Sequence, residues 1–307
     1  MLAITLSASA QPRPYIGYVY PAGGQQGTTF AVKLGGQNLE SASEVPVTGS
    51  GVSVRLVECY RRLGPQEITL LSEQLKELKQ AKPAGAAIKT NAEPMMMAAE
   101  MTMMSAATTP GKTNAVAGQD EATRKLIARI EKRIAEYCNR PASAALAGLV
   151  FVEVTVAPDA EPGERELRVR TPTGLSNPMV FCVGQLPEVS RKPMLTSSYQ
   201  VLGKEELALR KRPAEEAEDR ITLPCTLNGQ IASGEVNRYR FTAHQGQRLV
   251  VTTQARELIP FIADAVPGWF QPVLMLRDAK GKEVAYDDDY RFKPDPTILC
   301  EIPQDGD

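Results

Sequence analysis

The chain has 307 residues, of which 43% are hydrophobic, so it is long enough for two domains with a core in each. Its 35 basic residues nearly balance its 36 acidic ones, which argues against nucleic acid or an acidic membrane surface as the main partner. No segment approaches the apolar length that is needed to span a bilayer.

The first residues, MLAITLSASAQPRP, predict export. An apolar run leads to Ala8-Ser9-Ala10, the small-x-small pattern that signal peptidase cuts, and Pro-containing chain follows at once. The basic region that opens a signal peptide is missing, so we interpret residues 1 to 10 as a signal-peptide remnant. The alternative is a buried first strand. We expect a secreted, periplasmic or cell-envelope protein.

Two stretches far apart in the chain alternate like strands. Residues 15 to 39, YIGYVYPAGGQQGTTFAVKLGGQNL, hold a β-rich run, a Pro/Gly turn and an alternating strand. Residues 150 to 184 hold a second set, with a turn at Pro162-Gly163. The apolar positions that alternate are Phe30, Val32, Leu34, Val150, Val152, Val154, Val156, Leu167 and Val169.

These two stretches together resemble the IPT/TIG type of immunoglobulin-like domain. The first has the proline, GT-strand and GxNL pattern that opens the family, and GERELRVRTPTGLSNPMVFCV has the closing TPxGxSN strand pair. The resemblance implies an Ig-like sandwich over residues 15 to 185. Between the two motifs the sequence departs from the family pattern.

The departure is a predicted helical insertion at about residues 66 to 140. Residues 66 to 82 and 120 to 139 each carry an apolar stripe, which predicts two amphipathic helices packed as a hairpin or short coiled coil, with Asp120 as an N-cap. The stripes comprise Leu70, Leu71, Leu75 and Leu78 in the first helix and Leu126, Ile127, Ile130, Ile134 and Cys138 in the second.

The tip of the hairpin, residues 83 to 119, has no clear period and is expected to be disordered. Six methionines lie between Met95 and Met104; thioethers can hold Cu(I), but without a nearby His or Cys we favour a partner-seeking loop. Residues 186 to 219 are polar and mixed in charge, which predicts a linker.

From Arg220 onward short strands return. Tyr239, Phe241 and Ala243 alternate with polar residues, and Ala279-Lys280-Gly281 predicts a tight hairpin turn. LNGQI, GEVNRYRF, GQRLVV and PVLMLRDAKGKEVAYDDD resemble the bacterial pre-peptidase C-terminal domain, a jelly-roll-like sandwich of secreted proteins. The resemblance implies a second sandwich over 220 to 307, truncated at its C-terminus with an open strand edge. The fold class is therefore mainly β: two sandwiches, with an α-helical hairpin in the first.

The acidic run Asp287-Asp288-Asp289 raises the question of a metal site. Related sandwiches bind calcium near such loops, and Asp287 and Asp289 with Asp295 are the candidate ligands. Two carboxylates are too few alone and no DxDxDG loop is present, so we favour a solvated rim over calcium. Trp269 and Phe270, beside Gly and Pro, are a candidate carbohydrate or peptide surface, although core packing of the Trp is the simpler interpretation.

The remaining candidates do not form a catalytic set. His244 is the single histidine and no GxSxG elbow is present, while PGKT at 110 to 113 lacks the glycine that a phosphate loop requires. The five cysteines have no CxxC spacing, so we expect small core residues and leave one bridge open: Cys59, Cys138, Cys182, Cys225 and Cys300.

The sequence thus predicts a non-catalytic exported module for adhesion, substrate tethering or domain spacing, with an extracellular protein or carbohydrate as partner. No cofactor other than calcium is expected. The alternative is the accessory region of a secreted hydrolase, most plausibly a peptidase, whose catalytic domain lies outside this chain.

Overall fold

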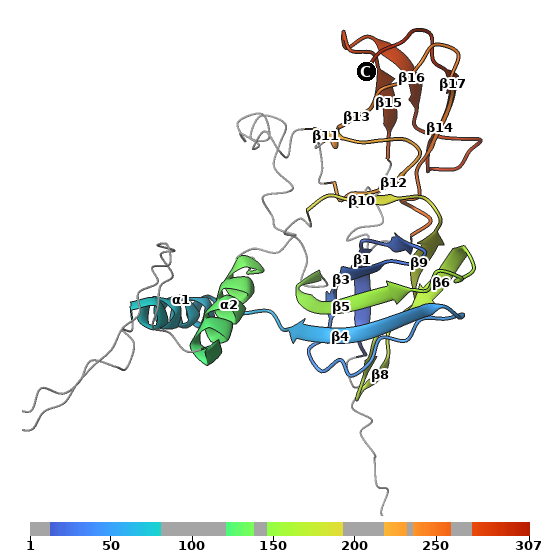
Figure 1. The fold of residues 1–307 in the computed structure, drawn as a ribbon. Coiled ribbons are helices and arrows are strands. Elements are labelled where there is room, and N and C mark those ends of the chain that lie inside the picture. The colour runs from blue at the N-terminus through green and yellow to red at the C-terminus, as the bar shows by residue number, and fades with distance from the viewer. Residues whose placement is uncertain (1–12, 81–120, 138–145, 193–217, 232–235, 259–271) are drawn as a thin grey trace, which may run out of the picture. The chain divides into compact units, whose positions relative to one another are not determined.

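The computed structural model describes residues 13–80, 121–137, 146–192, 218–231, 236–258 and 272–307. The chain divides into two compact units, one formed by Met1–Arg62 with Cys138–Asp307 and the other by Leu63–Tyr137 (Figure 1). The described part is mainly β, with two helices, which confirms the predicted fold class.

Two sheets form the N-terminal β region. The larger sheet is antiparallel with the order β1-β3-β5-β4, and the smaller has the order β2-β9-β6, in which β2 runs parallel to β9. The strands are β1 Tyr15–Tyr20, β2 Gly23–Gln25, β3 Thr29–Gln37, β4 Val52–Tyr60, β5 Gly148–Val156, β6 Gly163–Leu167 and β9 Met179–Gly184, and a short hairpin adds β7 Arg170–Thr171 and β8 Gly174–Leu175.

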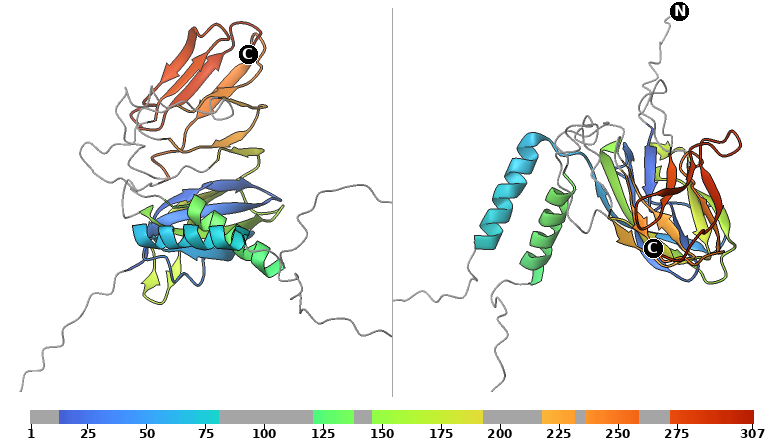
Figure 2. Two further views of the ribbon diagram at one scale, coloured as in Figure 1. Left: turned by 90° about the vertical axis from the view of Figure 1, so that its left-hand side faces the viewer. Right: turned by 90° about the horizontal axis from the view of Figure 1, so that it is seen from above.

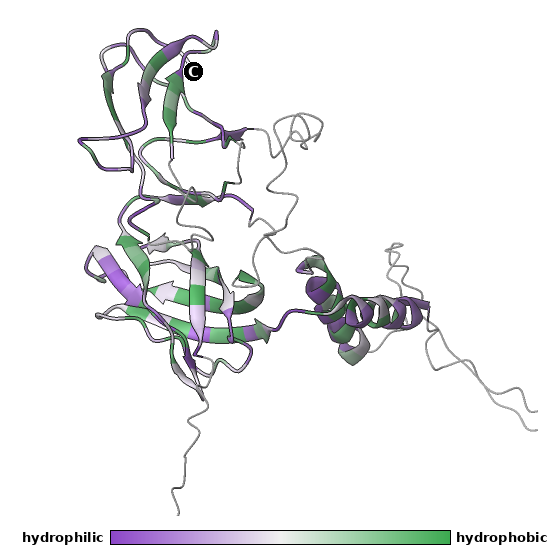
Figure 3. Ribbon diagram, turned by 180° about the vertical axis from the view of Figure 1, so that it is seen from behind, coloured by the Kyte–Doolittle hydropathy of each residue, from purple (hydrophilic) through white to green (hydrophobic). Residues whose placement is uncertain are grey.

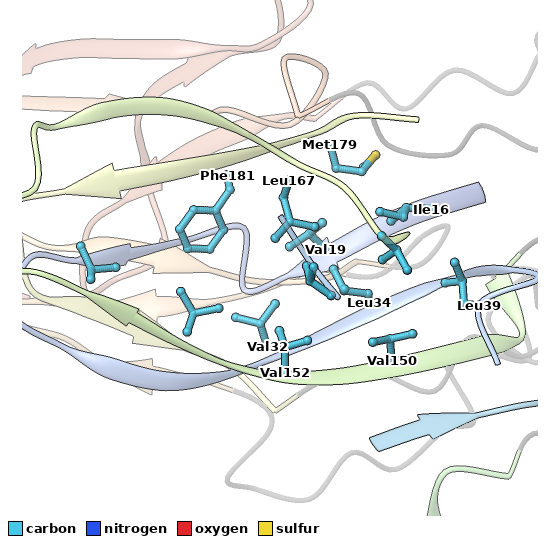
Figure 4. Packing of buried hydrophobic residues seen from close by; sticks show 14 of the residues in the cluster. Ile16, Val19, Val32, Leu34, Leu39, Val150, Val152, Leu167, Met179 and Phe181 are labelled. Atoms are coloured by element: carbon cyan, nitrogen blue, oxygen red, sulfur yellow. The ribbon is translucent and has the colours of Figure 1, made fainter. Parts of the chain in front are cut away.

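A hydrophobic core fills the space between these sheets. Phe181 and Leu167 from the smaller sheet face Val32 from the larger one (Figure 4). Each of these side chains is at most 1% exposed, and the ring of Phe30 stacks on that of Phe181 at a centroid distance of 6.3 Å. Burying one such side chain stabilises a fold by roughly 1.5–3 kcal/mol. The alternation predicted for β5 is confirmed, because its four even-numbered valines from 150 to 156 are all buried.

The helical unit interrupts a β-hairpin. Strands β4 and β5 are antiparallel neighbours, and Tyr60 at the end of β4 lies opposite Leu149 at the start of β5. The unit in between has its own contacts and forms a separate compact body. An insertion at the end of a hairpin leaves the strand pairing intact, which explains how the sheet can accommodate it.

Helices α1 (Pro65–Gln80) and α2 (Glu121–Ala135) lie side by side (Figure 2). Pro65 occupies the first helical position, and the Glu67 carboxylate accepts the Gly64 N–H at 2.8 Å, as in a capping box. Lys79 of α1 pairs with Glu131 of α2 at 2.6 Å.

On α1 the half-buried face includes Leu71 and Leu75, and on α2 Ile130 is fully buried. The prediction that Leu70 shares this face is wrong, because its side chain is 64% exposed. Adjacent helical positions are about 100° apart, so Leu70 and Leu71 cannot both face α2. Leu126, another predicted member of the stripe on α2, is 40% exposed. Asp120, Cys138 and residues 83 to 119 lie outside the described residues.

The C-terminal β region consists of short paired strands. Pairs β10–β12 and β11–β13 are parallel, and β14–β17 and β15–β16 are antiparallel. The strands are β10 Glu188–Ser190, β11 Asp219–Arg220, β12 Thr226–Asn228, β13 Tyr239–Arg240, β14 Arg248–Thr252, β15 Leu274–Arg277, β16 Glu283–Asp287 and β17 Thr297–Glu301. The predicted linker, residues 186 to 219, therefore contains β10 near its start and the first residue of β11 at its end.

The core of this region is small. Ala243, Leu249 and Ile302 are its buried members, although its strands carry further hydrophobic residues (Figure 3) and burial alternates along β14 and β15. The predicted turn between β15 and β16 is confirmed: Gly281 has a φ of +80° and donates its N–H to the Asp278 carbonyl at 2.8 Å. Neither described helix is long and apolar enough to cross a membrane.

Candidate functional site

Asp287 and Asp288 make local hydrogen bonds at the end of β16. The Asp287 carboxylate accepts the N–H of Thr297 at 2.6 Å and so closes the base of the loop between β16 and β17. The Asp288 carboxylate accepts the Tyr286 hydroxyl at 3.3 Å. Asp289 is exposed. These contacts agree with a turn-stabilising rim.

Asp295 is a structural cap. Its side chain is buried, and its carboxylate accepts the backbone N–H groups of Ala255, Arg256 and Glu257 at 2.8 to 3.1 Å. One carboxylate thus provides the acceptor for three partly buried backbone N–H groups of the loop. Both oxygens are therefore occupied, and a metal ion would have to compete with these bonds.

The alternative of a calcium site, with Asp287, Asp289 and Asp295 as candidate ligands, stays a prediction. In the part of the chain that the structure describes, no group of three or more His, Cys, Asp or Glu side chains is arranged to hold a metal ion. The second predicted ligand surface, Trp269 with Phe270, lies outside the described residues, as does the Met-rich segment.

The loop that follows the acidic run contains a strained turn. The Lys293 N–H bonds to the Tyr290 carbonyl at 3.0 Å, and the two central residues, Arg291 and Phe292, have φ of 51° and 65°. Positive φ at both central positions is the pattern of a type I′ turn, which favours Asn and Gly. A left-handed conformation costs an ordinary residue about 1–2 kcal/mol, so the chain accepts strain at this turn.

The described residues bring together a polar group that we call the junction cluster, which consists of the buried Tyr20 and the half-buried Arg191, Asp219, Asn228 and Tyr239. Tyr20 ends β1 in the N-terminal sandwich, and its hydroxyl donates to the Arg191 carbonyl at 2.5 Å and lies 3.1 Å from the Asn228 carbonyl. Arg191 follows β10 and Asn228 ends β12. One tyrosine therefore ties the first sandwich to both strands of the β10–β12 pair.

Arg191 connects Asp219 and Tyr239 within the junction cluster. Its guanidinium pairs with the Asp219 carboxylate at 3.0 Å and lies over the Tyr239 ring at 5.7 Å. The arginine side chain is 12% exposed and that of the aspartate 30%, so water screens this pair less than a surface pair. Asp219 and Tyr239 are also opposite each other in the β11–β13 pair.

Burial dominates the electrostatics of the junction cluster. It raises the pKa of Tyr20 to about 12, with Tyr239 adding to the shift and Arg191 opposing it. Burial likewise raises the pKa of Tyr239. Both phenols therefore stay protonated in neutral solution and can act as hydrogen-bond donors.

Two polar side-chain ends lie close to Gly229, which directly follows Asn228. A Cβ at Gly229 would lie 2.9 Å from the Asn237 side-chain nitrogen and 3.0 Å from the Tyr239 hydroxyl. Beside it, Asn228 donates to the Glu188 carboxylate at 2.6 Å across the β10–β12 pair. Burial raises the pKa of Glu188, and this hydrogen bond opposes the shift.

A second buried cation lies in the larger sheet. Lys33 is 6% exposed, and its ammonium lies over the Phe151 ring at 5.9 Å, which is a cation–π arrangement. The Tyr60 ring packs edge-on against Phe151 at 5.1 Å, and the Tyr60 hydroxyl donates to Glu58 at 2.6 Å. These contacts are on the sheet face opposite the alternating valines, so they anchor that face rather than the core.

The other sequence candidates are dispersed. The side chain of His244 is 80% exposed, and its Nδ1 lies 3.6 Å from Asp305. The four described cysteines are free, half-buried thiols. Burial raises the pKa of the Cys182 thiol to about 11, and Glu164, Glu188 and Glu257 add to the shift, so this thiol has little nucleophilic character.

The sequence analysis predicted no residue of the junction cluster as a site residue. The residues that Tyr20 joins are 171 and 208 positions further along the chain. The one local signal is Gly229, directly after β12, because a glycine beside a strand can allow a close approach of another group. No protein-family model matches the chain, and no curated protein is similar to it at a significant level.

Proposed function

We propose that this chain is a non-catalytic exported module of a larger secreted or cell-envelope protein, and that it holds two β domains at a fixed spacing. The observation that carries the proposal is the junction cluster. It joins the first sandwich, both described ends of the connector and the second β region through hydrogen bonds and one ion pair.

A spacer needs a stiff connection, whereas ordinary connectors between domains move freely. Strand β10 begins four residues after β9 ends and pairs with β12, so the connector leaves the first sandwich as part of a sheet. A partly buried ion pair such as that of Arg191 and Asp219 favours one arrangement, because separating the two charges would leave each without its partner in a poorly solvated place.

The family resemblances support the same role. Domains of the IPT/TIG and pre-peptidase C-terminal types occur in exported multidomain proteins of bacteria, where they act in adhesion, tethering or spacing. The signal-like start of the chain favours export, and the extracellular partner would be a protein or a carbohydrate.

Arg191→Ala tests the role of the junction cluster. The substitution removes the ion pair with Asp219 and the contact with Tyr239, so we expect a loss of roughly 1–3 kcal/mol in the free energy of unfolding of the C-terminal β region. Small-angle X-ray scattering should show a larger and more broadly distributed radius of gyration. The matched control is Arg170→Ala, which removes an exposed ion pair with Glu44. Scattering from Arg191→Ala that matches the wild type would contradict the proposed function.

A further inference from the structure

Asn228 and Gly229 form the single Asn-Gly step in the chain. The backbone nitrogen that follows an asparagine can attack the side-chain amide, and glycine favours this reaction because it has no side chain to hinder ring closure. The Gly229 nitrogen loses its proton and forms a bond to Cγ of Asn228. The bond from Cγ to Nδ2 breaks, and Nδ2 takes up a proton and leaves as ammonia. The product is a five-membered succinimide ring.

The structure holds both groups that would react. Nδ2 of Asn228 donates to the Glu188 carboxylate at 2.6 Å, which fixes the side-chain amide. The Asn228 carbonyl accepts the Arg191 N–H at 3.0 Å and the Tyr20 hydroxyl at 3.1 Å. This carbonyl and the Gly229 nitrogen belong to one planar peptide group, so the bonds that hold the carbonyl also fix the direction of the nitrogen.

The strand conformation of Asn228 separates the two groups. Ring closure requires Cβ of Asn228 and the Gly229 nitrogen to lie on the same side of the bond between Cα and the carbonyl carbon. Asn228 is the last residue of β12, and an extended backbone keeps these two atoms apart. Rotation into the reactive conformation would carry the carbonyl away from Arg191 and Tyr20. The reaction therefore has to wait until these hydrogen bonds open.

We propose that Asn228 is a deamidation site that the closed junction cluster protects and that opening of the cluster exposes to reaction. Water then hydrolyses the succinimide at one of its two carbonyl groups, which gives aspartate or isoaspartate at position 228. Neither product returns to asparagine in water, so the modification accumulates with the time that the cluster spends open. The inference goes beyond the spacing role and does not rest on it, because the chemistry depends only on these local bonds.

Both products would weaken the β10–β12 pair. Aspartate replaces the amide donor by a carboxylate, which would meet the half-buried Glu188 carboxylate and repel it. Isoaspartate routes the chain through Cγ, so the carbonyl that accepts the bonds from Arg191 and Tyr20 becomes a free carboxylate outside the main chain. In either case a hydrogen bond of the junction cluster is lost, which lowers stability.

The decisive experiment compares deamidation in the folded and the unfolded chain. The full chain is kept in mildly alkaline buffer with and without urea, and mass spectrometry of a proteolytic digest measures the modified fraction at position 228 over time. We expect the folded wild type to react roughly tenfold or more slowly than the chain in urea, since only the open population reacts. Asn228 that stays intact in urea, or that reacts equally fast in the folded chain, would overturn the inference.

Variants at Glu188 test whether the local bonds provide the protection. Glu188→Ala frees the Asn228 amide, so the folded variant should react roughly fivefold or more faster than the wild type. Glu188→Gln retains an acceptor for the amide and should react at the wild-type rate. Circular dichroism checks that each variant is folded, and in urea all of them should react alike.

Tyr20→Phe provides a second, independent variant. It removes one hydrogen bond to the Asn228 carbonyl and keeps the ring, so it should also speed the reaction in the folded chain. If neither Tyr20→Phe nor Glu188→Ala reacts faster than the wild type, the junction cluster does not control the site and the inference is overturned. Asn228→Asp, which mimics one product, should melt at a lower temperature than the wild type, and an unchanged melting temperature would refute the weakening of the β10–β12 pair.

Discussion

Burial alternates along strands of both β regions, but the two regions have very different interiors. Between the sheets of the N-terminal region, sixteen described side chains form one buried cluster, whereas the buried cluster of the described C-terminal region has three members. In the first region a sheet of four strands faces one of three, while in the second the described strands form pairs. Alternation gives a strand one apolar face, and only a second opposing layer converts that face into a core.

The largest expected effect tests this difference in core depth. Phe181→Ala removes a ring at the centre of the larger core, so we expect a loss of about 3–5 kcal/mol in the free energy of unfolding. Leu249→Ala, in the smaller core, should cost closer to about 2 kcal/mol, since the site is nearer solvent and can relax. Urea denaturation measures both. Equal costs would mean that the second core is as deep as the first.

Asp295→Ala examines what stabilises the C-terminal region when its core is small. Removal of the carboxylate leaves the N–H groups of Ala255, Arg256 and Glu257 without their acceptor, at an expected cost of about 2–3 kcal/mol. Asp289→Ala, an exposed neighbour in the acidic run, should change stability by less than about 0.5 kcal/mol.

The rate of amide hydrogen exchange at residues 255 to 257 should rise in Asp295→Ala and stay unchanged in Asp289→Ala. A similar loss of stability in the two variants would refute the capping role of Asp295. Thermal melts of the same proteins with calcium test the metal prediction separately. A wild-type melting temperature that millimolar calcium leaves unchanged would remove that prediction.

Excision of the helical unit asks whether the N-terminal sandwich depends on it. Replacing residues 63 to 137 with a short Gly-rich turn should change the stability of the sandwich by less than about 1 kcal/mol, because Tyr60 and Leu149 already pair at the end of the hairpin. Circular dichroism and denaturant unfolding measure the result. Loss of cooperative unfolding would show that the unit is an integral part of the sandwich.

Glu188→Gln has the smallest expected effect. Burial raises the pKa of Glu188, so the folded state holds its proton more tightly than the unfolded state does, and the ionised form lowers stability at neutral pH. Gln can still accept the Asn228 hydrogen bond without a charge. The variant should therefore be more stable by a few tenths of a kcal/mol at neutral pH, and its advantage should fade as the pH is lowered through the raised pKa of the wild-type carboxyl. An advantage that grows in acid would contradict this sign.

Local patterns predicted the elements but not the junction between them. Period-two alternation located β3 and β5, apolar stripes located both helices, and Gly281 located a turn, because each signal lies within one element. The face of Leu70 was misjudged, since adjacent leucines point in different directions on a helix. The Phe292 turn was missed because Arg and Phe are not residues that signal positive φ.

The junction cluster lay beyond sequence analysis for a different reason. Its members come from five strands or strand ends, and only the folded topology brings Tyr20 to Arg191 and Asn228. The acidic run drew attention because its charges are adjacent, yet the residue with the most backbone bonds, Asp295, stands apart from it. Adjacency in sequence was therefore a poor guide to which polar groups are structurally important.

The most direct test of the spacing role is backbone ¹⁵N relaxation of the whole chain under conditions where it is monomeric. If the junction cluster is stiff, residues of the N-terminal sandwich and of the C-terminal β region will report one common rotational correlation time, and Arg191→Ala will separate them into two shorter ones. Two distinct correlation times in the wild type would contradict the account.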